Sequence, residues 1–126
     1  MTETDPLART RRDYDRVADI YDDMVRHGRE DALATGMITA FATLVSAECD
    51  SGVVLNAGCG PGHWTDWLDR FGVSASGVDL SPGMIDIARR YRPDLSFEIG
   101  SLLGLPAVDA TVQGVLAHFS VIPYTA

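Results

Sequence analysis

The sequence predicts an α/β fold in which helices flank a mostly parallel sheet. Apolar runs at 53–55 and 112–119 have the continuous hydrophobic character of strands buried in such a sheet. Segments with hydrophobic residues at helical spacing lie between them, at 62–71 and 82–91. A glycine-rich turn at 58–62 joins the first strand to the first of these helices. This alternation of strands and helices is typical of a parallel sheet with helical crossovers.

Two helices are predicted before the first strand. The first begins at Pro6, a position where the missing amide costs no hydrogen bond. The second extends from about Asp31 to Ala47, with its apolar residues near one face. One face of the first helix carries apolar residues at i, i+3, i+4 and i+7, namely Tyr14, Val17, Ala18 and Tyr21. This stripe predicts that the first helix docks on the body of the protein.

The glycine-rich turn suits a ligand that approaches the backbone closely. Gly58, Gly60 and Gly62 permit a left-handed backbone and carry no side chains to obstruct a ligand. A dinucleotide-binding loop would have its third glycine where this chain has His63, so a nicotinamide-dependent oxidoreductase is disfavoured. Pro61 lacks an amide that a pyrophosphate would use, and no GKS or GKT sequence follows. A ligand without phosphates fits this loop best.

An acidic residue at the end of the second predicted strand points to the same site. The strand covers 75–79, and its last residue, Asp79, stands where adenosine ribose hydroxyls would lie beside such a loop. Ser81 is predicted to cap the next helix, with Pro82 in its first position. The third strand, at 95–99, alternates apolar and polar residues as a half-covered edge strand does. The ends of the first two strands therefore face one ligand site.

The composition describes an acidic globular chain of a single domain. Its 126 residues carry a formal net charge of −8 with a pI of about 4.6, and its 10 basic residues are all arginines, which argues against a nucleic-acid partner. Cys49 and Cys59 lack the spacing of a zinc site, so we expect no metal and two reduced thiols. No apolar run is long enough for a membrane span or a secretory leader. We expect a soluble, cytoplasmic protein.

Four segments of the sequence resemble the class I S-adenosylmethionine-dependent methyltransferases. They are LNAGCGPG, GVDLSPGMIDIARR, FEIGSLLGLP and GVLAHFSVIPY, in the order and at the spacing of that family, and the likeness covers roughly residues 52–124. The resemblance implies a Rossmann-like fold of three layers, α-β-α, with strand order 3-2-1-4 in the portion present. It also implies that S-adenosylmethionine is the cofactor. The YDxxAxxYD segment at 14–22 is similar to a lid that closes over cofactor and substrate in such enzymes.

The resemblance also implies the site residues. The family usually has an acidic residue where this chain has Asn56, and commonly another at Ser101, so two cofactor contacts are weaker than usual. Many small-molecule relatives carry a histidine where this chain has Pro123. His118, Tyr14 and Tyr21 are the candidate catalytic residues. The implied cofactor-binding residues are Asn56, Ala57, Gly58, Cys59, Gly60, Gly62, Asp79, Leu80, Met84, Ser101, Leu102 and His118.

The sequence leaves two functions open. Residues 1–50 are expected to form a helical lid and residues 51–126 the cofactor-binding half of the domain, which resembles a methyltransferase truncated after its fourth strand. The chain is then an enzyme, or half of one, that methylates a small molecule. The alternative is a non-catalytic or degenerate protein that retains the fold and acts by binding cofactor or a partner. In either case the fourth strand would be an open edge, which we expect a second copy, a partner chain or residues outside this sequence to cover.

Overall fold

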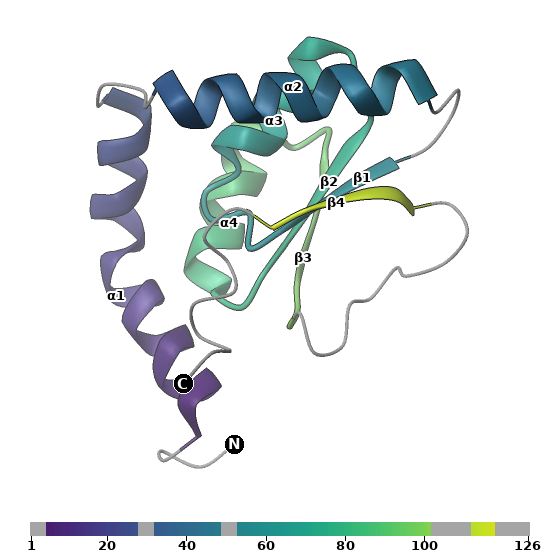
Figure 1. The fold of residues 1–126 in the computed structure, drawn as a ribbon. Helices are drawn as coiled ribbons and strands as arrows, with labels where there is room; N and C mark the ends of the chain where they lie inside the picture. Colours follow the sequence, from purple (N-terminus) through teal and green to yellow (C-terminus); the bar gives the residue numbers. More distant parts are fainter. Residues whose placement is uncertain (1–4, 28–31, 49–52, 102–111, 118–126) are drawn as a thin grey trace.

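The computed structural model describes residues 5–27, 32–48, 53–101 and 112–117, which form a parallel sheet with helices packed against it (Figure 1). The elements in chain order are α1 (Pro6–His27), α2 (Ala32–Glu48), β1 (Val53–Ala57), α3 (His63–Phe71), β2 (Ala75–Asp79), α4 (Pro82–Tyr91), β3 (Ser96–Ile99) and β4 (Val112–Leu116).

The four described strands are all parallel and lie in the order β3-β2-β1-β4. Asn56 pairs with Gly77 and Ala57 pairs with Val78, so β1 and β2 end level with each other. Parallel strands present their carboxyl ends at the same edge of a sheet, where α/β proteins bind ligands. The predicted fold class and strand order are confirmed.

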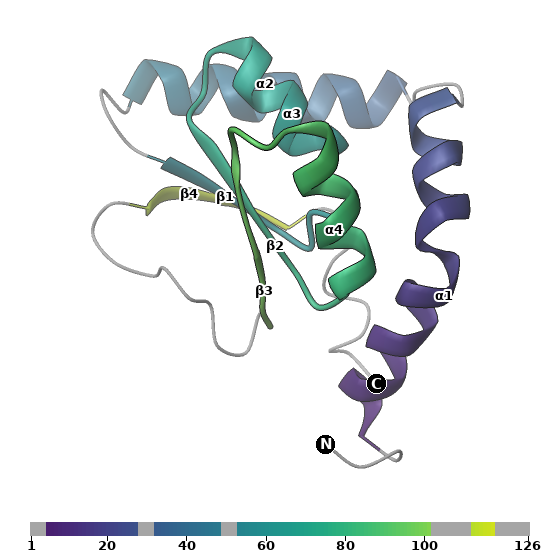
Figure 2. The same cartoon turned by 180° about the vertical axis from the view of Figure 1, so that it is seen from behind.

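Helices α2, α3 and α4 pack on one face of this sheet (Figures 1 and 2). Val54 points to that face and packs with Ile38 of α2 and Leu68 of α3, all of which are buried. Further along the same face, Phe97 of β3 packs with Ile85 of α4. Alternate residues of a strand point to the same side of the sheet. The register of the strands therefore determines which strand residues face the helices.

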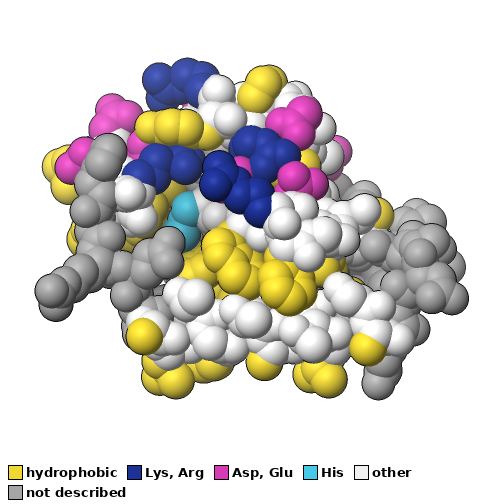
Figure 3. Space-filling view, turned by 90° about the horizontal axis from the view of Figure 1, so that it is seen from above, with side chains coloured by type: hydrophobic (Ala, Val, Ile, Leu, Met, Phe, Trp, Pro, Cys, Tyr) yellow, Lys and Arg dark blue, Asp and Glu magenta, His cyan; other side chains and the backbone are white. Residues whose placement is uncertain are grey.

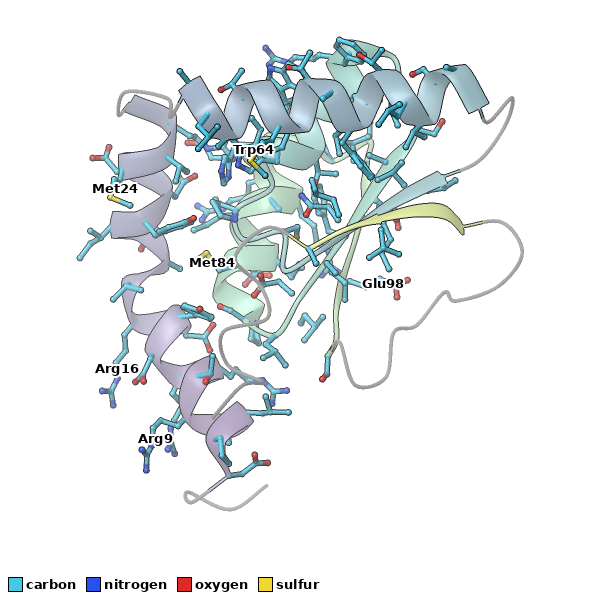
Figure 4. All side chains as sticks on the ribbon, in the orientation of Figure 1. Arg9, Arg16, Met24, Trp64, Met84 and Glu98 are labelled. Carbon is cyan, nitrogen blue, oxygen red and sulfur yellow. The ribbon has the colours of Figure 1, made fainter. Side chains whose placement is uncertain are left out.

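Helix α1 lies beside α4 in both ribbon views (Figures 1 and 2). Ala18 of α1 packs with Met84 and Ile87 of α4, and Tyr21 borders this cluster. In Figure 4, Met84 points from α4 toward α1, whereas Arg16 and Met24 point away from the body. The apolar stripe predicted for the first helix therefore does dock on the body. None of the described helices is long and apolar enough to cross a membrane.

Several element boundaries differ from the sequence prediction, and three of them lie on the strands and loop that form the candidate site. Strand β1 continues past Leu55 to Ala57, because both added residues pair with β2. Gly62 precedes α3 as its cap, in a left-handed conformation with φ +84°, and is not its first residue. Strand β4 ends at Leu116, short of the predicted Phe119, which lies outside the described residues. In the described sheet β4 is an edge strand with Val115 47% exposed, as the predicted strand order 3-2-1-4 requires, although its apolar run has the character of a buried central strand.

Candidate functional site

The loop after β1 is fixed to β2 by its own backbone. The amides of Gly58 and Cys59 both donate to the carbonyl oxygen of Val78, at 2.8 and 3.0 Å. The Gly62 amide closes the turn by donating to the Cys59 carbonyl at 3.1 Å. Gly58, Gly60 and Gly62 all have positive φ, of 76°, 56° and 84°. The loop is therefore a rigid turn built from backbone, as the glycine spacing predicted.

Gly62 must be a glycine for reasons of space as well as backbone conformation. A Cβ at this position would lie 3.0 Å from both Ala88 Cβ of α4 and Phe97 Cζ of β3. Contacts this short between carbon atoms are repulsive, so a side chain here would push the loop away from α4. Gly62 thus allows the loop and α3 to sit close against the second βα unit.

Asp79 connects this loop to the loop after β2. It is only 8% exposed, and its Oδ2 accepts a hydrogen bond from the Gly60 amide while its Oδ1 accepts one from the Ser81 amide, both at 2.9 Å. Burial raises the pKa of this carboxyl, the two amides oppose that shift, and the charge of Asp15 adds to it. The predicted ribose-binding residue is therefore a buried carboxylate between the two loops.

Asn56 lies behind the loop and is 3% exposed. Its Nδ2 donates to Oγ1 of Thr65, a fully buried residue of α3, at 3.0 Å. Thr65 was not among the residues singled out from the sequence, since a threonine inside a helix carries no motif signal. The Asn56 side chain thus ties the end of β1 to α3, and its predicted cofactor contact stays a prediction.

Two tyrosines of α1 lie near Asp79. The Tyr21 ring covers the glycine-rich loop, because a Cβ built on Gly60 would be 3.6 Å from Tyr21 Cε1. Burial, and to a lesser extent the Asp79 charge, raises the pKa of both Tyr14 and Tyr21. Both hydroxyls are therefore protonated at neutral pH, which suits hydrogen-bond donation better than proton abstraction.

The remaining predicted residues fall into two groups. Leu80 and Cys59 are buried next to Asp79, and burial raises the Cys59 pKa well above its usual value, so this thiol is protonated. Ser101 is half-buried, one residue after Gly100, whose amide donates to the Asp79 carbonyl at 2.9 Å. Met84 packs in the α1–α4 contact described above. Leu102 and His118 lie outside the described residues.

Three charged residues of α1 reach the same two loops and were missed in the sequence. Arg11 donates from Nε to the Leu80 carbonyl at 3.0 Å, and Arg26 donates from Nη2 to the Pro61 carbonyl at 2.7 Å. Asp15 accepts from the Gly83 amide at 2.8 Å. The YDxxAxxYD segment contains Asp15, but sequence alone gives no sign of a partner 68 residues away.

The end of the sheet brings together groups that suit a small ligand. Among the described ranges, no three His, Cys, Asp or Glu side chains gather as metal ligands. Instead, the end of the sheet offers a loop with three glycines, a buried carboxylate at Asp79 and the aromatic ring of Tyr21 on α1. Such a site can bind a ligand with hydroxyl groups and exclude water from it.

Curated relatives are methyltransferases of several kinds. The chain is 33% identical to demethylmenaquinone methyltransferase of Beutenbergia cavernae over 119 residues, covering 90% of this chain and 50% of that protein. It is 39% identical to trans-aconitate 2-methyltransferase of Methylobacterium nodulans over 80 residues, covering 56% of this chain and 31% of that one. The chain thus spans half or less of the length of these two relatives.

Solved structures show the same fold. The chain superposes on magnesium protoporphyrin IX methyltransferase of Synechocystis with a TM-score of 0.72 and 16% identity, over 98% of this chain and 66% of that one. It is also similar to DesVI of Streptomyces venezuelae, with a TM-score of 0.62 and 27% identity over 83% of this chain and 44% of that one. The sequence model of the "Methyltransferase domain" family matches residues 54–126. That match covers the whole ligand-facing end of the sheet and more than half of the sequence, and the chain belongs to the methyltransferase domain family.

Proposed function

We propose that this chain binds S-adenosylmethionine at the end of β1 and β2 and serves as all or half of a small-molecule methyltransferase. The observation that carries the proposal is the buried Asp79 carboxylate, hydrogen-bonded at 2.9 Å to the amide of Gly60 in the glycine-rich loop. This places a hydrogen-bond acceptor for ribose hydroxyls directly beside a loop whose glycines present only backbone to a ligand. The crystal structure of the Synechocystis relative with bound S-adenosylmethionine supports it.

The residues present fit such a cofactor. Each Asp79 oxygen accepts one backbone amide, and a carboxylate has lone pairs left to accept ribose hydroxyls as well. Asp15 adds a second negative charge near Asp79, so the site disfavours phosphate groups and favours a cationic ligand such as a sulfonium. Gly58 and Gly60 would face the cofactor with backbone only, and Leu80 would lie beside it.

When bound, S-adenosylmethionine would supply a methyl group already activated for transfer, so the protein needs mainly to orient the acceptor and exclude water. Helix α1 suits that role, because Tyr21 covers Gly60 and Tyr14 lies near Asp79. Both phenols would donate hydrogen bonds to an acceptor molecule. His118 remains the candidate general base from the sequence.

The acceptor class follows from charge and from the relatives. The net charge of −8 disfavours nucleic acid, and the names of two relatives specify small acceptors, demethylmenaquinone and trans-aconitate. Two other relatives are named for a malonyl group on an acyl-carrier protein, which is also a small acyl group. Their variety within one family leaves the individual acceptor open. We therefore propose a small organic molecule.

Calorimetric titration with S-adenosylhomocysteine, the demethylated product, tests the proposal. Wild type is expected to bind, and Asp79→Asn is expected to bind about 10- to 100-fold more weakly, because a neutral amide replaces a charged acceptor. The matched control is Asp86→Asn, which changes an exposed acid on α4. Undetectable binding by wild type, or equal binding by Asp79→Asn and wild type, would overturn the proposed site.

One observation favours the alternative of a non-catalytic protein. Asn56 stands where relatives usually have an acid, and its amide is engaged by Thr65. A protein of this second kind would bind the cofactor but would not transfer its methyl group. Incubation with S-adenosylmethionine and a set of candidate acceptors separates the two functions: formation of S-adenosylhomocysteine that depends on an acceptor supports the enzyme, and cofactor binding without it supports the alternative.

A further inference from the structure

Helix α1 is attached to both ligand-facing loops by polar contacts along its length. Near its start Arg11 reaches the Leu80 carbonyl, and near its end Arg26 reaches the Pro61 carbonyl. Arg26 is also held by Asp22 and stacks on the Tyr91 ring, 3.4 Å from its centroid. Both carbonyls belong to the loops that Asp79 joins. The position of α1 is therefore coupled to the geometry of the site.

Asp15 makes the central contact. Its Oδ1 accepts the Gly83 amide at 2.8 Å and also the hydroxyl of Ser81. Ser81 is fully buried and caps α4 by accepting the Met84 amide at 3.1 Å. Asp15 thus satisfies an amide in the first turn of α4 that has no partner within its own helix. One carboxylate on α1 extends the N-terminal cap of α4.

Asp15 lies on α1 between two tyrosines, of which Tyr21 reaches the glycine-rich loop. Tyr14 precedes it in the chain, and Tyr21, six residues further on, rests over Gly60. The apolar contact of Ala18 with Met84 lies between them. The hydrogen bonds from Ser81 and Gly83 to Asp15 therefore fix how closely both tyrosines approach the loop.

We infer that Asp15 is a positioning residue that keeps α1 closed over the cofactor site, and that it thereby slows release of bound cofactor. This inference rests on the proposed function for its ligand. The cofactor would leave when α1 separates from the two loops. The Asp15 contact with Gly83 and Ser81 is then part of what must break.

The first test needs no ligand. The Tyr21 ring shifts the NMR resonances of Gly60 as long as α1 is docked, and Tyr21→Leu gives the value without that ring. In Asp15→Ala the Gly60 resonances are expected to move toward the Tyr21→Leu value. In the control, Asp19→Ala, which changes another exposed acid on the same helix, they should stay at the wild-type position. Identical Gly60 resonances in Asp15→Ala and Asp19→Ala would overturn the inference.

The second test measures release directly. Stopped-flow dissociation of S-adenosylhomocysteine should be about threefold to tenfold faster from Asp15→Ala than from Asp19→Ala. Asp15→Asn keeps an oxygen acceptor for the Gly83 amide, so its dissociation rate should lie between those of wild type and Asp15→Ala. Unchanged dissociation in Asp15→Ala would overturn the inference. Absence of binding by wild type would count against the proposed function instead, and the ligand-free test would still decide the position of α1.

A third variant distinguishes a weaker contact between α1 and α4 from a general loss of stability. Gly83 has no positive φ, and a Cβ there would lie 3.0 Å from Asp15 Oδ1. Gly83→Ala should therefore favour the helical state of α4 while pushing the Asp15 carboxylate away. We expect unchanged or higher thermal stability together with faster dissociation of the product. Slower dissociation than wild type would contradict the role of this contact.

Discussion

At the scale of a single residue, Asp79 is the buried carboxylate that connects the two loops of the candidate site. A carboxylate at 8% exposure is disfavoured by burial, and here two backbone amides offset part of that cost. The net effect is a pKa raised above the ordinary value of 3.8. The protein thus accepts some loss of stability to keep a charged acceptor next to the glycine-rich loop.

This raised pKa predicts a pH dependence of stability with a definite sign. The folded state binds the Asp79 proton more tightly than the unfolded state does, because the pKa is higher in the folded state. Asp79 therefore favours folding most at pH values below its unfolded pKa of about 3.8. This contribution to stability is lost as the pH rises through the higher pKa of the folded state. The free energy of unfolding of wild type, relative to Asp79→Asn, should therefore fall across this interval. Urea unfolding at a series of pH values measures this difference in the free energy of unfolding. An increase in the stability of wild type relative to Asp79→Asn as the pH rises would refute the prediction.

At this scale the sequence identified some site residues and missed others. Asp79 and the glycines were predicted, since each follows a strand end and has a recognisable spacing. Asp15 and Thr65 were not assigned a role, because their partners are set by tertiary packing and not by local pattern. Short-range signals reveal such contacts only after the fold has placed the elements.

Among the elements, the turn from β1 into α3 depends most on one glycine. Gly62→Ala is expected to lower the free energy of unfolding by about 2–4 kcal/mol. Alanine disfavours the left-handed backbone at this position, and its Cβ would lie 3.0 Å from Ala88 and Phe97. Gly72→Ala is the matched control, with φ +100° but open space around the added Cβ, and should cost only about 1–2 kcal/mol. Chemical denaturation measures both, and equal losses would mean that crowding at Gly62 is unimportant.

In helix α2, replacement of a glycine by alanine is expected to stabilise the protein. Gly36 is exposed in the helix interior, has no positive φ and meets nothing within 4 Å of an added Cβ. Gly36→Ala should therefore stabilise the protein by about 0.5–1 kcal/mol through a lower backbone entropy of unfolding. A lower melting temperature for this variant would contradict that expectation.

Element types followed from sequence more reliably than element ends. The cap at Ser81 and the start of α4 at Pro82 were predicted, because capping chemistry is local. The extension of β1 through Ala57 was not, because it depends on pairing with β2 across the sheet. The apolar run of β4 indicated a strand but not its end at Leu116, whereas the edge position of β4 followed from the strand order that the resemblance implied.

At the scale of the whole molecule, the described part leaves apolar surface on two sides. Strand β4 is an edge with Val115 47% exposed. Seen from above, hydrophobic side chains also gather over α2 and beside it (Figure 3), where Leu33, Met37 and Leu44 are each more than half exposed. An open strand edge is a site for pairing with another chain.

We therefore expect concentration-dependent self-association through β4. Light scattering after size exclusion should show higher-mass species in wild type, and fewer in Val115→Lys, because an edge lysine opposes strand pairing. Leu44→Lys on the outer face of α2 is the comparison, and it should leave this association intact. A wild-type monomer at every concentration, or assembly lost only in Leu44→Lys, would show that β4 is not the contact.

The central claim is that the cofactor binds where the glycine-rich loop meets Asp79. A ¹⁵N NMR titration with S-adenosylhomocysteine tests it most directly, because the amides of Gly58, Gly60 and Ser81 surround that point. These resonances should shift in a saturable manner, while amides such as Thr43 on α2 stay in place. Saturable shifts confined to α2, or no shift at the three loop amides at the highest ligand concentration, would contradict the account.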